Sequence, residues 1–354
     1  MITLSRKDTK TINVVKGSAA SVVVLAHVYQ LLLQPSFSNK YVNFIVYTLG
    51  SYSVYIFFVV SGFLIYFSIY NQISINRNRK FSFSLFIKKR IVRLYPPLIF
   101  VLLFMGAYYF ITIQFNLDYL VGREVDPTRT EIALDSGYFA SFFFAQNMFV
   151  NVFDAPSFNG PLWSLSHEFW FYVLIGLLSL NREQPLYKRV LVSAILFLFI
   201  FILPLKKDFY MGFIVWLCGF FCGYLYGNKI TLDKRLFFIL LIMSIIFWLS
   251  LLLLKYFWLS KYTFGIIFAV LFSSILQVGC NENFITQSLQ EAGKYSYTLY
   301  IIHWPLLMIS YQLFYDYVIF DSLGLLMISF ISLGVIYSFS SYVSQYIEGI
   351  KIKN

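Results

Sequence analysis

Long apolar runs separated by short polar segments repeat along almost the whole chain. About 20 predominantly apolar residues are enough to cross the hydrocarbon core of a bilayer as a helix. The pattern therefore predicts an all-α polytopic membrane protein with about ten transmembrane helices. The predicted spans are centred on residues 12–34, 43–70, 92–115, 161–180, 188–205, 209–227, 235–254, 262–279, 295–314 and 322–345.

Composition and charge support this interpretation and add a topology. Of the 354 residues, 59% are hydrophobic and only 12% are charged, which leaves too little charged surface for a soluble domain of this length. The net charge is +11, but the basic residues fall between apolar runs, so we expect no nucleic-acid partner. With the N-terminus inside, 20 of the 27 basic residues are cytoplasmic. The positive-inside rule then favours ten spans with both termini cytoplasmic.

Two connections between the predicted spans are longer than the others. Residues 71–91 alternate basic with aromatic side chains, a pattern typical of a segment lying on the cytoplasmic membrane surface. Residues 116–160 fall on the opposite side and carry several acidic residues. Within this second connection, the apolar segment 136–150 is too short to span, so we interpret it as a re-entrant or interfacial helix.

The first predicted span contains a histidine, His27, at about two-thirds of its length. Ionisable side chains are costly in the hydrocarbon layer and often mark a pathway or a catalytic centre. Eleven helical steps of about 100° place Lys16 and His27 on one face, about 16 Å apart along the axis. His27 could also bridge helices, and Lys16 alone is an ordinary basic residue at a cytoplasmic helix end.

A pair of arginines lies at the cytoplasmic entry to the third span. Arg90 and Arg93 are three residues apart and therefore share a helical face. Two guanidinium groups so placed suit a phosphate or a pyrophosphate. Anchoring to anionic lipid is the alternative, and spacing alone does not decide between them.

The fourth span begins with the sequence GPLWSLSHEFWFY, residues 160–172. Ser164 and Glu168 are four residues apart on one face, just after Trp163. Glu168 should lie about 10 Å inside the span, where a carboxylate needs either a partner or a bound proton. His167 points about 100° away from Glu168, and we assign it no role.

Two further segments carry polar or small residues inside predicted spans. Ser296, Tyr300 and His303 fall on one face of the ninth span and form a polar stripe that ends in an imidazole. Ser61 and Gly62 in the second span would let another helix, or a thin ligand, approach closely.

Taken together, these segments resemble the acyltransferase-3 family, membrane O-acyltransferases that modify bacterial surface polysaccharides and other cell-envelope acceptors. The resemblance rests on the order and spacing of five motifs over nearly the whole chain. They are Lys16 with His27, Ser61-Gly62-Phe63, Arg90 with Arg93, Trp163-Ser164-Leu165 with Glu168, and Ser296-Tyr297 with Tyr300 and His303. The chain departs from the family's more common residues by a lysine at position 16 and by His167 before the glutamate.

The resemblance implies an acyl-CoA donor that binds from the cytoplasm, and we expect acetyl-CoA. Its phosphates would lie near Lys16, Arg90 and Arg93, and its pantetheine arm would bring the thioester toward His27. No metal is expected, and the three cysteines lack metal-ligand spacing.

The resemblance also implies catalytic roles. His27 would act as a general base or as a transiently acylated nucleophile, Glu168 would orient groups or relay protons, and His303 would support them. The remaining motif positions would bind substrate or shape the site. These are Ser61, Trp163, Ser164, Ser296 and Tyr300.

The acceptor would be a hydroxyl of a surface polysaccharide or a lipid-linked glycan on the outer side of the bacterial inner membrane. We expect one membrane domain over residues 1–354 without a separate periplasmic SGNH-type domain, so transfer would occur in the membrane unit or with a separate periplasmic partner. The alternative is a transporter or flippase of an isoprenoid-linked glycan, in which the cations bind a lipid diphosphate and the histidines relay protons.

Overall fold

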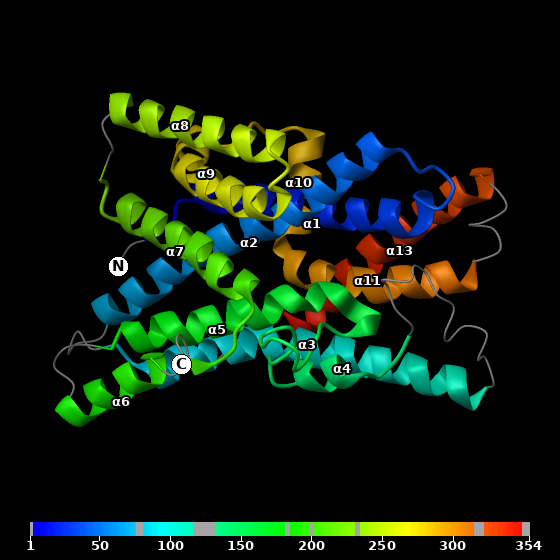
Figure 1. Cartoon of the computed structure of the whole chain (residues 1–354), viewed down its shortest axis with the longest axis horizontal. Helices are drawn as coiled ribbons and strands as arrows, with labels where there is room; N and C mark the ends of the chain where they lie inside the picture. The colour runs from blue at the N-terminus through cyan, green and yellow to red at the C-terminus, as the bar shows by residue number, and fades with distance from the viewer. Residues whose placement is uncertain are drawn as a thin grey trace. The chain divides into compact units, whose positions relative to one another are not determined.

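The computed structural model describes residues 3–75, 81–115, 132–180, 185–197, 202–230, 234–314 and 322–348 (Figure 1). All regular elements in this part of the chain are helices, which confirms the all-α class. Their bounds are α1 Arg6–Val28, continued by the π-helical η1 Tyr29–Leu33, α2 Lys40–Ile75, α3 Phe83–Gln114, α4 Ser136–Ser141, the 3₁₀ helix η3 Ser157–Leu162, α5 Trp163–Leu178, α6 Leu186–Phe197, α7 Lys207–Gly227, α8 Lys234–Leu253, α9 Phe257–Val278, α10 Phe284–Lys294, α11 Ser296–Leu313 and α13 Ser322–Ile347.

Six of the described helical segments are long and apolar enough to cross a membrane, so the protein is a multi-pass membrane protein. These segments are Arg6–Leu33, Lys40–Ser74, Phe83–Gln114, Lys207–Gly227, Phe257–Val278 and Leu323–Ile347. Helices α5, α6, α8 and α11 lie at the other four predicted positions. The total of ten spans and the cytoplasmic location of both termini stay predictions.

The chain packs as two compact units, and each is described by itself. The first unit comprises Met1–Ala19, Ser51–Lys88 and His167–Gly293, and the second comprises Ala20–Gly50, Lys89–Ser166 and Lys294–Asn354. The division cuts α1, α2, α3 and α5, and it also separates Lys294 from the rest of α10, so each of these helices contributes to both units. The interpretation of residues 1–354 as one membrane domain stays a prediction.

In the first unit, α9 packs against both α7 and α8, and α7 lies against α2 at two glycines. A Cβ on Gly62 would lie 2.2 Å from the carbonyl oxygen of Trp216, and one on Gly219 would lie 2.2 Å from that of Val59. Only glycine allows the two backbones to come this close. The predicted close approach at Ser61 and Gly62 is therefore confirmed, and the approaching element is helix α7.

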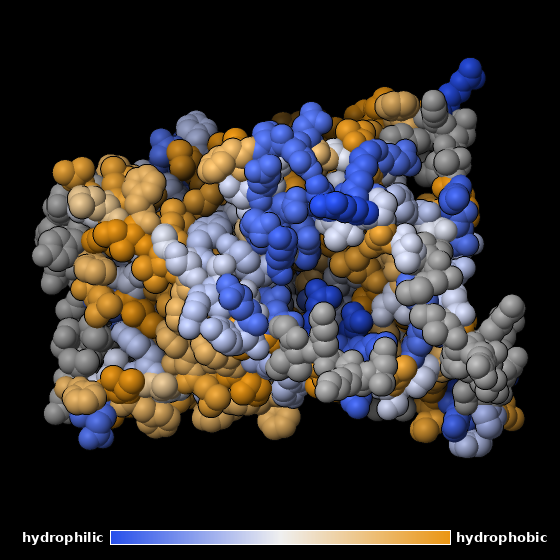
Figure 2. All heavy atoms as spheres, turned by 180° about the vertical axis from the view of Figure 1, so that it is seen from behind, coloured by the Kyte–Doolittle hydropathy of each residue, from blue (hydrophilic) through white to orange (hydrophobic). Residues whose placement is uncertain are grey.

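In the second unit, α11 packs against α13, η3 and η1, and α4 packs against η3. Large apolar side chains of this unit are nevertheless exposed, including Phe330 at 73% and Leu103 at 61%. Figure 2 shows hydrophobic residues over part of one face, beside a group of hydrophilic residues. An apolar surface of this kind needs a bilayer to cover it, in keeping with a membrane protein.

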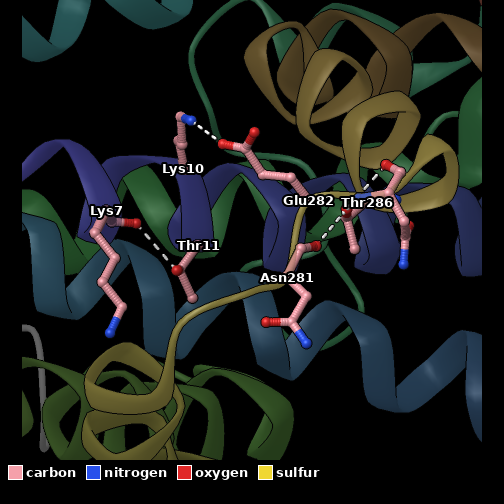
Figure 3. Close-up of polar contacts among 7 residues, drawn as sticks. Lys7, Lys10, Thr11, Asn281, Glu282 and Thr286 are labelled. Atoms are coloured by element: carbon pink, nitrogen blue, oxygen red, sulfur yellow. Dashed lines mark hydrogen bonds and ion pairs between the residues drawn. The ribbon is translucent and has the colours of Figure 1, made fainter.

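Polar contacts connect the start of α1 to the segment that leads into α10 (Figure 3). Lys10 forms an ion pair with Glu282, which lowers the pKa of the Glu282 carboxyl. The Asn283 side chain accepts a hydrogen bond from the Thr286 N–H at 2.8 Å and thereby caps the first turn of α10. Helix α10 was not predicted, because its 11 residues are too short and too polar to resemble a span.

The expected re-entrant or interfacial helix over residues 136–150 is wrong beyond its first turns. Helix α4 ends at Ser141, and the chain continues as turns in which Phe144 and Asn147 have φ values of 52° and 56°. Backbone in this left-handed region cannot continue a right-handed helix. Gln146 holds the turns to η3 and α5. Its side-chain amide donates to the Leu162 carbonyl of η3 at 2.9 Å, and its backbone carbonyl accepts from the Ser166 hydroxyl of α5 at 2.7 Å.

Parts of two other predictions lie outside the described residues. The surface segment 71–91 includes residues 76–80, and the acidic connection includes residues 116–131, which carry most of its carboxylates. Asp135 is described, and its side chain caps α4 by accepting the Tyr138 N–H at 2.8 Å.

Candidate functional site

Two of the predicted catalytic residues, His27 and His303, are in direct contact in the second unit. His27 Nδ1 lies 2.8 Å from His303 Nε2, and the two ring planes differ by only 6°. His27 lies near the end of α1, and His303 lies in the middle of α11. His303 is fully buried, whereas His27 is only partly buried.

The hydrogen bonds determine which ring nitrogens carry protons in the neutral pair. His303 Nδ1 lies 3.2 Å from the Leu299 carbonyl oxygen, which can only accept, so Nδ1 carries the hydrogen. In a neutral imidazole the other nitrogen, Nε2, is then an acceptor. His27 Nδ1–H therefore donates to His303, and His27 Nε2 is the ring nitrogen without a hydrogen, which can accept a proton. This is the tautomer that a general base requires.

Aromatic and polar groups of α11 surround this pair. The Trp304 ring meets the His27 ring edge-on, with centroids 4.7 Å apart and planes at 77°. The Tyr300 hydroxyl lies 2.8 Å from the Ser164 hydroxyl and donates to the Pro161 carbonyl at 3.0 Å. These contacts tie the start of α5 to the helix that carries His303, and both hydroxyls are buried.

A proline in α11 explains why η3 docks beside the histidine pair. Pro305 has no N–H, so the Ile301 carbonyl four residues earlier lacks its usual helical partner. The Asn159 side-chain amide donates to this carbonyl at 2.8 Å. Asn159, itself fully buried, therefore fixes η3 against α11 at Ile301, two residues before His303. Asn159 was not predicted from the sequence, although a proline inside a helix indicates a carbonyl that needs another donor.

Glu168 belongs to a separate network in the first unit. The Tyr172 hydroxyl donates a short hydrogen bond to Glu168, and the Ser61 hydroxyl lies 2.8 Å from the Tyr172 oxygen. Trp216 Nε1 donates to Ser61 at 3.2 Å. Because a carboxylate only accepts, all the hydrogens in this series point toward Glu168, from Trp216 through Ser61 and Tyr172.

This network supplies the partner that a carboxylate at Glu168 was expected to need. Tyr172 follows Glu168 by four residues. The same four-residue spacing that places Ser164 and Glu168 on one helical face could therefore have predicted the contact between Tyr172 and Glu168. Ser164 instead pairs with Tyr300. His167 is fully buried and packs edge-on against the Phe209 ring, with ring centroids 5.4 Å apart.

The predicted phosphate-binding residues are divided between the units. Arg90 is half-buried and Arg93 is exposed, and both lie near the start of α3 in the second unit. Lys16 is half-buried on α1 and belongs to the first unit. Planar guanidinium groups suit the paired oxygens of a phosphate, so the chemistry of the two arginines fits the predicted ligand.

The two remaining motif positions are found at helix starts. Ser296 is buried as the first residue of α11, and Trp163 is half-buried as the first residue of α5. Both lie in the second unit, with His27 and His303. The catalytic, donor-binding and substrate-binding roles of the predicted residues stay predictions.

Comparison with known proteins identifies the family. Searches of curated proteins and of solved structures found no match for the chain. A comparison with protein families matched residues 9–343 to acyltransferase-3, described as an acyltransferase domain. Membership of this family favours an acyltransferase over the alternative of a transporter. The match covers nearly the whole chain, so the protein belongs to the acyltransferase-3 family and is a multi-pass membrane acyltransferase.

Proposed function

We propose that the protein transfers an acetyl group from cytoplasmic acetyl-CoA to a hydroxyl of a surface polysaccharide or lipid-linked glycan on the outer side of the bacterial inner membrane. The observation that carries the proposal is the His27–His303 pair, because it leaves His27 Nε2 with the electron pair that proton abstraction needs. Family membership supports acyl transfer as the reaction class. Acetyl-CoA, when bound, supplies an activated thioester.

His27 acts as the general base of the reaction. Its Nε2 accepts the proton of the acceptor hydroxyl while the hydroxyl oxygen forms the new ester bond. His27 then returns this proton to the sulfur that is released when the carbon–sulfur bond breaks. The imidazole ends the cycle in its starting tautomer, and no proton is gained or lost overall.

His303 stabilises the charged form of His27. When His27 becomes an imidazolium, its Nδ1–H donates to His303 Nε2 as a charge-assisted hydrogen bond, which is stronger than the neutral bond that preceded it. The bond lies among buried side chains, where low polarity strengthens it further. His303 therefore acts through His27, as a positioning residue.

Arg90, Arg93 and Lys16 bind the phosphates of the donor on the cytoplasmic side. The guanidinium groups offer forked donors, and the lysine adds a compact positive charge. Glu168, held by the hydroxyl of Tyr172, orients groups or relays protons for the transfer.

In a covalent route, His27 Nε2 would first attack the thioester carbonyl and release CoA as its thiolate when the carbon–sulfur bond breaks. The acceptor hydroxyl would then attack the acetylated imidazole, its oxygen forming the ester as the carbon–nitrogen bond breaks and its proton passing to the CoA thiolate. The two routes are separated by incubating the protein with acetyl-CoA alone and examining His27 peptides by mass spectrometry. Acetylated His27 would support the covalent route. No acetylation with acetyl-CoA alone, in protein that transfers acetyl rapidly once the glycan is added, would support the general-base route.

The function is tested with purified protein, acetyl-CoA labelled in the acetyl group, and isolated polysaccharide or lipid-linked oligosaccharide. We expect label to appear in the glycan and to be released by mild alkali, as an ester requires. Absence of both transfer and CoA release with every acceptor and acyl donor would overturn the proposal.

A further inference from the structure

A groove runs between α7 and α9 in the first unit and has a volume of about 1,310 Å³. Both helices are candidate membrane spans, and one side chain of α8, that of Phe238, also contributes to the lining. Several apolar side chains that line this α7–α9 groove are substantially exposed, including Ile214 at 47% and Phe221 at 58%. The surface between α7 and α9 is therefore concave and apolar.

The groove has an apolar end and a polar end. The apolar end contains Ile214 of α7 and Ile266 of α9, and the polar end contains Tyr226 and Gln277 of the same helices. From Ile214 to Tyr226 the helix rises about 18 Å. One leaflet contributes about half of the roughly 30 Å hydrocarbon core, so the groove is about as long as one leaflet is deep.

The polar end contains a hydrogen-bonded carboxylate and two lysines. Asp8 accepts hydrogen bonds from the Tyr226 hydroxyl and the Ser5 N–H, each at 2.9 Å. Lys229 lines the groove just beyond the end of α7 and is exposed. Lys7 donates to the Gln277 carbonyl at 2.6 Å and so places a second cation at the rim.

The cations also indicate which leaflet the groove faces. Lys229 and Lys7 both belong to segments that the positive-inside rule assigns to the cytoplasmic side. Basic pockets between membrane helices on this side attract anionic lipid headgroups. A partner's transmembrane helix would need a groove that continues over the full depth of the hydrocarbon core, whereas the lining ends at Ile214, about seven residues inside α7.

We propose that the α7–α9 groove binds one anionic phospholipid of the cytoplasmic leaflet. An acyl chain lies along the apolar residues between α7 and α9, and the phosphate lies beside Lys229, where the Tyr226 end of the groove supplies polar surroundings. This site is independent of the proposed acetyl transfer, since none of its lining residues belongs to the histidine pair, the Glu168 network or the predicted phosphate-binding set.

The chain-binding part is tested by filling the groove. Ser274 lines it on α9, whereas Ser250 lies on α8 outside it, so Ser274→Phe and Ser250→Phe form a matched pair. Protein stripped of lipid is titrated with phosphatidylglycerol, and bound lipid is counted by native mass spectrometry. We expect one tightly held phosphatidylglycerol per chain in the wild type and in Ser250→Phe, and at least tenfold weaker binding in Ser274→Phe. Equal binding by the two variants would overturn the proposal.

The headgroup part is tested with a second matched pair. Lys229 and Lys255 are both exposed and both have positive φ, 56° and 61°, so Lys229→Asn and Lys255→Asn impose similar changes on the backbone. Loss of one lysine beside an anionic headgroup should weaken phosphatidylglycerol binding by about fivefold. We expect weaker phosphatidylglycerol binding in Lys229→Asn and unchanged binding in Lys255→Asn. Phosphatidylethanolamine has no net charge, so Lys229→Asn should weaken its binding less than it weakens the binding of phosphatidylglycerol. Unchanged binding in Lys229→Asn, or a wild type that dimerises through the groove in place of binding lipid, would contradict the proposal.

Discussion

Replacing His303 with leucine should slow acetyl transfer by removing the acceptor for His27 Nδ1–H. The two nitrogens are 2.8 Å apart, and the bond becomes charge-assisted once His27 takes a proton. Hydrogen bonds to charged groups are worth about 1.5–3 kcal/mol, and about 1.4 kcal/mol is tenfold in rate, so kcat should fall about 10- to 150-fold. The KM for acetyl-CoA should change little, because the bond strengthens only as the reaction proceeds.

Leucine suits this position as a test because His303 is fully buried and leucine keeps an apolar side chain of similar size there. His303→Gln serves as the conservative variant, because the glutamine side-chain oxygen can still accept from His27, so it should retain more activity than His303→Leu. The assay measures labelled acetyl transfer to glycan under initial-rate conditions, with folding checked by thermal unfolding in detergent.

A double-mutant comparison shows whether His303 acts through His27. If it does, the double variant His27→Ala/His303→Leu should be no slower than His27→Ala alone, since the hydrogen bond is already lost. Multiplicative losses, with each substitution lowering the rate independently, would refute the reasoning from the tautomer.

Three further predictions concern other parts of the structure. Tyr172→Phe removes the hydrogen bond to Glu168 and should lower kcat about tenfold while keeping the fold. Activity equal to that of the wild type would show that this hydrogen bond does not contribute to the reaction. Gly219→Ala places a Cβ 2.2 Å from a carbonyl oxygen of α2 and should destabilise the protein by about 1–3 kcal/mol, measured as a lower Tm, whereas Gly334→Ala, with no atom within 4 Å, should not. Arg93→Ala should weaken acetyl-CoA binding most at low ionic strength, because at high ionic strength salt screens the contact between Arg93 and the phosphate even in the wild type. An equal loss of affinity at all salt concentrations would argue against a phosphate contact.

The sequence predicted the helical class and the key histidines because both depend on local pattern. Long apolar runs identify helices in a bilayer, and an ionisable residue within one stands out against its neighbours. The pairing of His27 with His303 could not be predicted in the same way, since it depends on how α1 and α11 pack. The resemblance of the segments around His27 and His303 to family motifs indicated that the two histidines share a site. It did not indicate which ring nitrogens carry the hydrogens.

The Glu168 network shows where local spacing stops being informative. Tyr172 follows Glu168 by one helical turn and could have been predicted from spacing alone. Its further connection to Ser61 and Trp216 depends on the close approach of α2 and α7. Gly62 indicated that some helix could approach there, but no local pattern indicates which one.

Two errors of the sequence interpretation have a common physical cause. The apolar segment 136–150 was expected to form a helix, but apolar composition does not reveal left-handed residues such as Phe144 and Asn147. Helix α10 was overlooked because a short helix with a polar face lacks the 20 apolar residues of a span. In both cases tertiary contacts, and not hydropathy, determine the backbone.

The central claim is that His27 is the base of the acetyl transfer, and the most direct test compares His27→Ala with His167→Gln. Both variants lose a histidine from a helix, but only His27 is paired with His303. Removing a general base typically costs about 10²–10⁴ in rate, so His27→Ala should transfer labelled acetyl to glycan at least 100-fold more slowly than the wild type. His167→Gln, if it unfolds at the wild-type temperature, should stay within about threefold of wild-type activity. Near wild-type transfer by correctly folded His27→Ala would contradict the account.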